Sequence, residues 1–226
     1  MGIRERQERE REGVRRAILD AARALFVEEG YAQVSMRKIA ERIEYSPAAI
    51  YGYFPSKDDI FFALAEEGFD LLHAAAAAEP DSADPLDTLR SRLFGFYEFS
   101  KAHPEYFALM FLDRSVPRIL EQYPQFERLA ALRERAAATV RRAIDAGVFP
   151  ATLDATSAFA VLITAVKGAA VTRTCHRHAH GEDTDALARD LIETVIAGLR
   201  AGTPLSFRAD AAGCPAGAPV DRAPVS

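Results

Sequence analysis

The sequence predicts an all-α fold, in which a small N-terminal helical domain precedes a larger helical bundle. Apolar residues recur at intervals of three and four along most of the 226 residues, which is the period of an amphipathic helix. Serine, aspartate or proline precedes several of these stretches, as is typical of helix starts. No stretch alternates with period two for long enough to indicate a β-sheet.

Three closely spaced helices are expected near the N-terminus. The first runs from about Val14 to Glu29, behind a charged extension at residues 1–13, in which Arg and Glu alternate without an apolar face. Residues 35–43 form a second helix, with Ser35 as its N-cap. A third begins at Ser46-Pro47 and ends near residue 54, because the residue before a proline avoids the helical conformation. Two short helices joined by a tight turn indicate a helix-turn-helix, whose second helix enters the major groove of DNA.

The rest of the chain is expected to form a helical body that binds a ligand and dimerises. Helices are expected over residues 56–78, 85–102, 104–112, 124–146, 154–173 and 183–200. We assign residues 14–60 to the DNA-binding domain and 61–202 to the body. Residues 203–226 are rich in proline and alanine and are expected to be a disordered tail.

A resemblance to a known family supports the helix-turn-helix assignment. The segment IAERIEYSPAAIYGYFPSKDDI, preceded by ILDAARALFVEEGYAQVSM, resembles the DNA-binding domain of the TetR family of one-component regulators over roughly residues 14–62. HPEYFALMF resembles a segment in the ligand-binding domains of some such regulators. The resemblance implies a homodimer that binds a palindromic operator in double-stranded DNA, most simply as a repressor.

The start of the third helix is the part expected to read DNA bases. Small side chains there let the backbone approach the base edges, and their methyl groups can contact thymine. These residues are Ser46, Pro47, Ala48 and Ala49. The family pattern implies phosphate contacts for Ser35, Arg37, Tyr51, Tyr53 and Lys57. Tyr53 as a core aromatic and Arg37 as an ordinary solvated charge are the alternatives, and an extension reaching the minor groove is an alternative to a solvated arm.

Two departures from the pattern and the charge balance bear on DNA binding. Glu44 occupies the turn position where glycine is usual, so the backbone there either accepts strain of about 1 kcal/mol or adopts another turn. Pro47 stands where Lys or Arg often follows the capping serine, which leaves few donors for guanine. The net charge is -5, but residues 31–57 hold four basic and two acidic side chains, a local excess suited to phosphates.

Aromatic residues between positions 94 and 126 predict a ligand pocket. Nine of the chain's 21 aromatic side chains lie in this stretch, on more than one helix face. Apolar and aromatic groups line ligand pockets in helical bundles. The expected ligand residues are Phe94, Tyr97, Tyr106, Phe107, Met110 and Phe111, with a hydrophobic or aromatic small molecule as the effector. Dense core packing without a cavity is the alternative.

The last two helices are expected to form the dimer interface, because each carries an apolar stripe. The proposed interface residues are Phe159, Leu162, Val166, Leu191 and Val195. The loop between these helices contains Cys175, His176, His178 and His180, which are possible metal ligands. Neighbouring ligands on one short segment rarely complete a tetrahedral site, so an exposed loop is favoured and no metal or other cofactor is expected.

Several classes of function are disfavoured by the sequence. It contains no HExxH, nucleophile elbow or glycine-rich phosphate loop, so a helical enzyme is a weak alternative. No signal peptide is evident, and the longest apolar run, residues 158–166, is too short for a membrane span. The two cysteines, Cys175 and Cys214, suggest no disulfide framework, and a cytoplasmic location is expected. A DNA-binding regulator without an effector is the main alternative, and neither the effector nor the operator can be read from the sequence.

Overall fold

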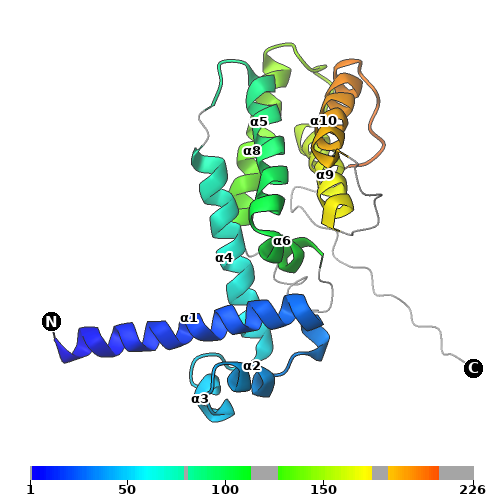
Figure 1. Ribbon diagram of the computed structural model, residues 1–226. Coiled ribbons are helices and arrows are strands. Elements are labelled where there is room, and N and C mark those ends of the chain that lie inside the picture. The colour runs from blue at the N-terminus through cyan, green and yellow to red at the C-terminus, as the bar shows by residue number, and fades with distance from the viewer. Residues whose placement is uncertain (1, 79–80, 113–126, 175–182, 209–226) are drawn as a thin grey trace, which may run out of the picture.

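The computed structural model describes residues 2–78, 81–112, 127–174 and 183–208. Within these ranges the chain is helical, with connecting segments and no β-strand. Figure 1 shows a helical head at the N-terminal end and a taller helical body, with one long helix passing from the first into the second. The prediction of an all-α fold is confirmed.

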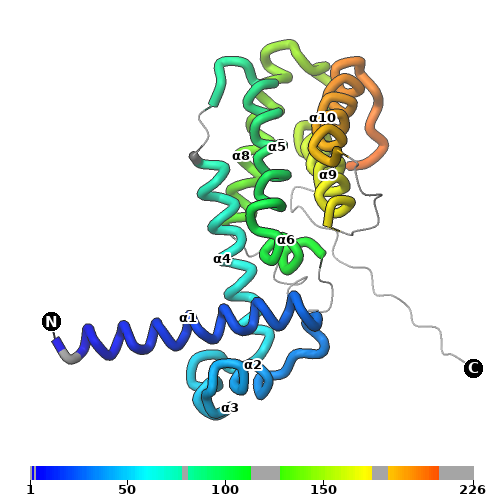
Figure 2. The backbone as a smooth tube through the Cα atoms, in the orientation of Figure 1, coloured from blue at the N-terminus to red at the C-terminus, as the bar shows by residue number. Residues whose placement is uncertain are grey.

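The head contains one long helix, a 3-10 turn and two short helices, which follow one another in sequence. They are α1 (Ile3–Glu29), the 3-10 turn η1 (Tyr31–Gln33), α2 (Met36–Arg42) and α3 (Pro47–Tyr51). Helix α1 ends at Glu29 and is capped by Gly30, whose φ of 81° is a conformation that favours glycine. It begins near residue 3 rather than at Val14, so the charged extension is helical. This part projects from the head (Figure 2). The charged side chains of residues 4–12 are exposed.

A small apolar core holds the head together. Ile18 and Ala22 of α1, Ile39 of α2 and Ile50 of α3 are fully buried, as their helical spacing predicts. The aromatic rings of Phe26, Tyr31 and Phe61 pack on one another with centroids 5.3–5.7 Å apart. Since Phe61 belongs to the long helix that leaves the head, this contact fixes the direction in which that helix departs.

The body is built from the long helix and five others. These are α4 (Lys57–Ala78), α5 (Pro85–Ala102), α6 (Pro104–Phe111), α8 (Glu127–Asp145), α9 (Ala155–Thr174) and α10 (Thr184–Arg200). Helices α4, α5, α8 and α9 pack lengthwise, α10 packs on α9, and α6 crosses between the body and α1 (Figures 1 and 2). The start of α5 follows the predicted pattern, with Asp84 as N-cap and Pro85 in the first turn.

Polar contacts join the head to the body beside the apolar packing. Arg16 of α1 donates to Glu67 of α4, and the Arg23 guanidinium donates to the Tyr106 hydroxyl of α6 at 2.7 Å while lying over its ring. Because α1 contacts both α4 and α6, a shift of either helix would displace α1 and with it the head.

Candidate functional site

The two short helices of the head are started by the caps that the sequence predicted. The Ser35 hydroxyl accepts a hydrogen bond from the Lys38 amide, and the Ser46 hydroxyl accepts one from the Ala49 amide, both at 3.2 Å. Between the helices, Glu44 has a φ of 59°, in the left-handed region. The backbone therefore takes the strained option of the two expected for a non-glycine residue at this turn.

Helix α3 exposes its first turn and the side opposite the buried Ile50 to solvent. Ser46, Pro47 and Ala48 are exposed, Ala49 is half-buried and Tyr51 is 54% exposed, whereas Ile50 is fully buried. The helix ends at Tyr51 rather than at residue 54, because Gly52 closes it through bonds to the carbonyls of Ala49 and Ile50. The exposed strip is thus short and carries only small side chains and one tyrosine.

Tyr45 is a residue of this surface that sequence reasoning did not single out. It lies in the turn before α3 and is 45% exposed. A large aromatic residue in a polar turn, outside either apolar stripe, is the signal that could have identified it. With Tyr51 it places two exposed tyrosines on the same helix-turn-helix unit.

The basic residues beside α3 are paired with carboxylates of the head. Arg37 donates to Glu41 at 2.7 Å, Arg42 donates to Glu28 at 2.8 Å, and Lys38 contacts Glu29. The Arg37 side chain is 80% exposed. Exposed pairs of this kind contribute at most about 1 kcal/mol, so a phosphate can replace the carboxylate at little cost.

Lys57 and Tyr53 have structural contacts in the head. The Lys57 ammonium donates to the carbonyls of Tyr31 and Val34 at 2.7 and 2.8 Å and lies over the Tyr31 ring. Tyr53 is half-buried, with the Arg11 guanidinium 5.9 Å from its ring centre. Lys57 therefore ties the start of α4 to η1 and the residue that follows it, and its expected phosphate contact stays a prediction.

A second feature of the molecule is a cavity of about 610 Å³ in the body. It lies between α4, α5, α8 and α9, with Phe111 of α6 and residues 207–208 also on its wall. Most of the lining is apolar, with Leu72 of α4, Phe99 of α5 and Phe159 of α9 as examples. The volume falls within the range of small-molecule sites, roughly 300–1,000 Å³.

The comparisons with known proteins agree with this arrangement. Residues 18–64 match the family model described as bacterial regulatory proteins of the tetR family. A transcriptional repressor of Mycobacterium tuberculosis, Rv1474c, is 35% identical over 130 residues, which are 57% of this chain and 63% of that protein. The match thus spans less than two thirds of that relative's own length.

Solved structures share the fold over most of the chain. The fatty acid degradation regulator FadR of Bacillus halodurans has a TM-score of 0.68 at 21% identity, covering 82% of this chain and 96% of that one. FadR of Bacillus subtilis, solved in complex with stearoyl-CoA, also has a TM-score of 0.68 at 21% identity, covering 80% and 97%.

The chain therefore carries a DNA-binding domain of the TetR family of bacterial regulatory proteins at residues 18–64. The relative and the two structural neighbours named above are described as regulators, and none of them supports the helical-enzyme alternative. The matched residues include α2, α3 and the turn between them, so the family match contains the whole helix-turn-helix described above.

Of the six residues expected to bind a ligand, only Phe111 lies on the cavity wall. Phe107, Met110 and Tyr106 are buried in the packing between α6 and its neighbours, and the Tyr106 hydroxyl is held by Arg23. Phe94 packs beneath Arg189. The neighbouring aromatics Phe96 and Phe99, with Phe159 of α9, line the cavity instead.

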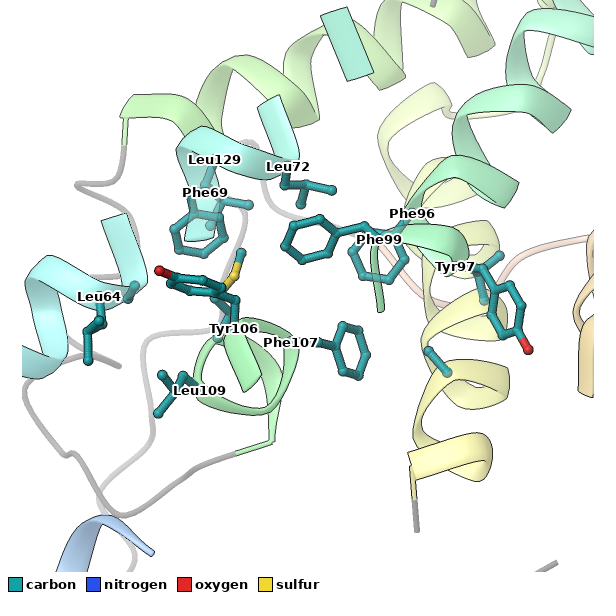
Figure 3. Packing of buried hydrophobic residues seen from close by; sticks show 14 of the residues in the cluster. Leu64, Phe69, Leu72, Phe96, Tyr97, Phe99, Tyr106, Phe107, Leu109 and Leu129 are labelled. Carbon is teal, nitrogen blue, oxygen red and sulfur yellow. The ribbon is translucent and has the colours of Figure 1, made fainter. Parts of the chain in front are cut away.

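Tyr97 shows why the sequence could not assign these faces. Its ring is turned away from Phe96 and Phe107 (Figure 3), and its hydroxyl lies 2.8 Å from Asp185 and 3.0 Å from Thr184 of α10. Burial raises the pKa of this phenol. The residue joins α5 to α10, and its partners are 87 and 88 positions away in the sequence.

The predicted dimer residues fall into two groups. Leu162 and Val166 are 1% and 0% exposed, because they pack against the protomer's own helices, so these two cannot contact a second copy as expected. Phe159 lines the cavity. Leu191 and Val195 are half-buried and, with the 38% exposed Leu187, follow the outer face of α10 at intervals of four.

Helix α9 has apolar residues on more than one face. It is long and apolar enough to cross a membrane by length and composition, and 39% of its most apolar stretch is buried inside the protein. A core helix passes the same test, so this is weak evidence for a membrane span.

The cluster Cys175, His176, His178 and His180 lies outside the described residues, and among the described ones no group of His, Cys, Asp and Glu side chains could hold a metal.

Proposed function

We propose that this chain is a homodimeric, DNA-binding transcriptional repressor that releases a palindromic operator when a hydrophobic small molecule enters its body. The observation that carries the proposal is the position of α4. Its first residue, Lys57, is hydrogen-bonded within the DNA-binding head, and its later residues Leu72, Ala75 and Ala76 form part of the cavity wall. One rigid element therefore connects the effector site with the helix-turn-helix.

The head supports DNA binding through its shape and its exchangeable ion pairs. The exposed turn from Ser46 to Ala48 gives base edges close access to the backbone, and Tyr51 lies beside it for a phosphate contact. Arg37 exchanges Glu41 for a phosphate. Because few donors for guanine are present, the operator is expected to be read through thymine methyl groups and DNA shape.

The body supports a regulated rather than a constitutive DNA binder. An effector acts only through its different affinities for the DNA-bound and the released conformations. A ligand that fills the cavity pushes on α4 from the side of Leu72 and alters the angle between body and head. The Bacillus subtilis neighbour was solved in complex with stearoyl-CoA, and the long apolar chain of that molecule is the type of group that the apolar lining of this cavity could bind. The alternative, a regulator with no effector, leaves the cavity without a role.

The dimer is proposed to form through the outer faces of α9 and α10. Leu187, Leu191 and Val195 leave an apolar stripe on α10, and the small residues Ala165 and Gly168 allow close approach on α9. Changing Leu191 to Arg is expected to give a monomer in sedimentation measurements, since a buried unpaired charge opposes association. Retention of the dimer would contradict this interface. As a regulator of bacterial transcription, the protein is proposed to act in the cytoplasm.

Selection of bound duplexes from a random pool tests the function directly. Recovery of a palindrome, with binding that weakens steeply as salt rises, is the expected result. The same duplex then serves to test release by apolar compounds. Recovery of a site without two-fold symmetry would refute the dimeric proposal. If an Ala48→Glu variant bound the selected duplex as tightly as the wild type does, the assignment of α3 to base reading would be refuted.

A further inference from the structure

Three arginines next to the cavity share one carboxylate among the residues that the structure describes. Arg92 of α5 and Arg135 of α8 line the cavity, and Arg142 lies about two turns further along α8. Asp81 is paired with all three, through contacts of 3.7 Å to Arg135 and 3.2 Å to Arg142 and a hydrogen bond from Arg92. The three arginines and Asp81 therefore carry a net positive charge; Glu98, which also lines the cavity, is paired with Lys101.

Arg92 is the most enclosed member of this cluster. Its side chain is 12% exposed, and its guanidinium donates to the Arg135 carbonyl at 3.1 Å and to the Thr139 hydroxyl. Burial holds the pKa of Arg92 below the ordinary arginine value, and the positive charges of Arg135 and Arg142 act in the same direction against the effect of Asp81. The guanidinium remains protonated at neutral pH, so a second anion beside it would be stabilising.

The position of Arg92 in the sequence is unusual for a solvated charge. It falls among Leu89, Leu93 and Phe96, which occupy the cavity-facing side of α5 at helical spacing. Placing a charge in a buried apolar stripe costs free energy unless the charge is paired and hydrogen-bonded. Here the only described carboxylate partner is Asp81, which is 47% exposed and lies in the α4–α5 connection rather than in the cavity.

We propose that the effector of this cavity is an amphipathic acid, with an apolar chain or ring among α4, α5 and α9 and an anionic head group on Arg92 and Arg135. This inference rests on the proposed function and names the chemical class of its ligand. At about 30 Å³ per water-sized group, the volume accommodates on the order of 20 non-hydrogen atoms. A carboxylate fits the planar fork of a guanidinium in a way that an alcohol does not.

The acid group takes over part of the role of Asp81. Asp81 lies three residues after the last residue of α4, and the Arg142 guanidinium also donates to the Ser82 carbonyl at 3.1 Å. When a ligand carboxylate binds Arg92, the attraction that holds residues 81–82 to α5 and α8 weakens. Because residues 81–82 follow α4 in the chain, binding of the ligand's carboxylate can change the position of α4, the helix that enters the DNA-binding head.

The test compares three ligands that share one chain: decanoate, decan-1-ol and decylammonium, with affinities measured by calorimetry on the full-length protein. Decanoate is expected to bind at least tenfold more tightly than the alcohol, and decylammonium more weakly than either. Arg92→Gln is expected to weaken decanoate binding by about 10- to 100-fold, which is the loss of a charge-assisted hydrogen bond. Arg141→Gln, on the exposed side of α8, is the matched control and should have no effect.

Asp81→Asn gives a result of opposite sign that a merely structural role would not produce. Removing the competing carboxylate should tighten decanoate binding about two- to fivefold and leave decan-1-ol unchanged. Retained decan-1-ol binding by Arg92→Gln shows that this variant is folded. Lys167 of α9 also lines the cavity, with its ammonium 4.9 Å from the centre of the Phe111 ring. Loss of decanoate binding in Lys167→Gln but not in Arg92→Gln would overturn the assignment.

The outcomes separate this inference from the proposed function. Equal affinity for decanoate and decan-1-ol would refute the acid-binding site and leave an apolar effector cavity standing. Failure of all three ligands to bind would refute the acid-binding site and remove the cavity from the proposed function, while the duplex selection still decides whether the protein binds DNA.

Discussion

Gly68 allows α4 and α6 to pack more closely than any residue with a side chain would permit. A Cβ atom built at this position would lie 2.4 Å from the Met110 sulfur and 3.2 Å from Cδ1 of the Tyr106 ring. Met110 is 6% exposed, and the Tyr106 ring is held by the hydrogen bond from Arg23. Neither neighbour can move without disturbing the packing around it, so Gly68→Ala is expected to strain this contact.

The magnitude follows from two opposing terms. Replacing glycine by alanine within a helix is worth about 1 kcal/mol of stability from backbone conformation alone. Adding a methyl group to a filled core costs about 1–3 kcal/mol. Gly13→Ala in α1 is the matched control, since a Cβ there meets nothing within 4 Å and only the first term applies. The two variants should therefore differ by about 1–3 kcal/mol, or by roughly 2–12 °C in Tm.

Urea denaturation of the purified variants measures this difference. Met110→Ala supplies the second side of a double-mutant cycle, because it removes the obstructing sulfur. In that background Gly68→Ala should lose most of its penalty, with a coupling of about 1–3 kcal/mol. If Gly68→Ala stabilises the protein as much as Gly13→Ala does, the close approach of α4 to α6 is wrong, and with it the seating of α4 between the body and the head.

Three other outcomes are expected. Glu44→Gly relieves the positive φ in the α2–α3 turn and should raise the free energy of unfolding by up to about 1 kcal/mol after the flexibility of glycine in the unfolded chain is counted; a loss of stability would contradict the strained turn. Tyr51→Ala should weaken operator binding about fivefold or more at every operator sequence without changing Tm, because the side chain is 54% exposed and is proposed to contact phosphate. The ammonium of Lys101 and then the hydroxyl of Tyr97 lower the folded-state pKa of Asp185, so its carboxylate contributes stability above pH 3.8 that is lost as the pH falls through the lower folded value. Asp185→Asn should accordingly cost about 1 kcal/mol at pH 7 in urea denaturation, and the difference from wild type should disappear in acid; a difference independent of pH would refute this.

Local signals in the sequence determined much of the head. The capping serines Ser35 and Ser46 and the proline at position 47 act on backbone groups within three residues, so their effect can be read without knowing the fold. Helical periodicity likewise identified the buried faces that contain Ile39 and Ile50. At Glu44 the sequence left two options open, and the conformation of the finished turn decided between them.

The tertiary structure decided what each buried face of the body meets. Periodicity shows that Leu162 and Val166 share an apolar face with Phe159, but only helix packing shows that this side is turned toward the protomer's own cavity and core. The same holds for Tyr97, whose partners on α10 lie more than 80 residues away. For Arg92, the sequence shows a charged residue within an apolar stripe. That it shares the carboxylate of Asp81 with other arginines is seen only in the packing of α5, α8 and the residues after α4. Sequence spacing fixes which side chains lie on one face of a helix, whereas the neighbour that covers this face depends on how the whole set of helices packs.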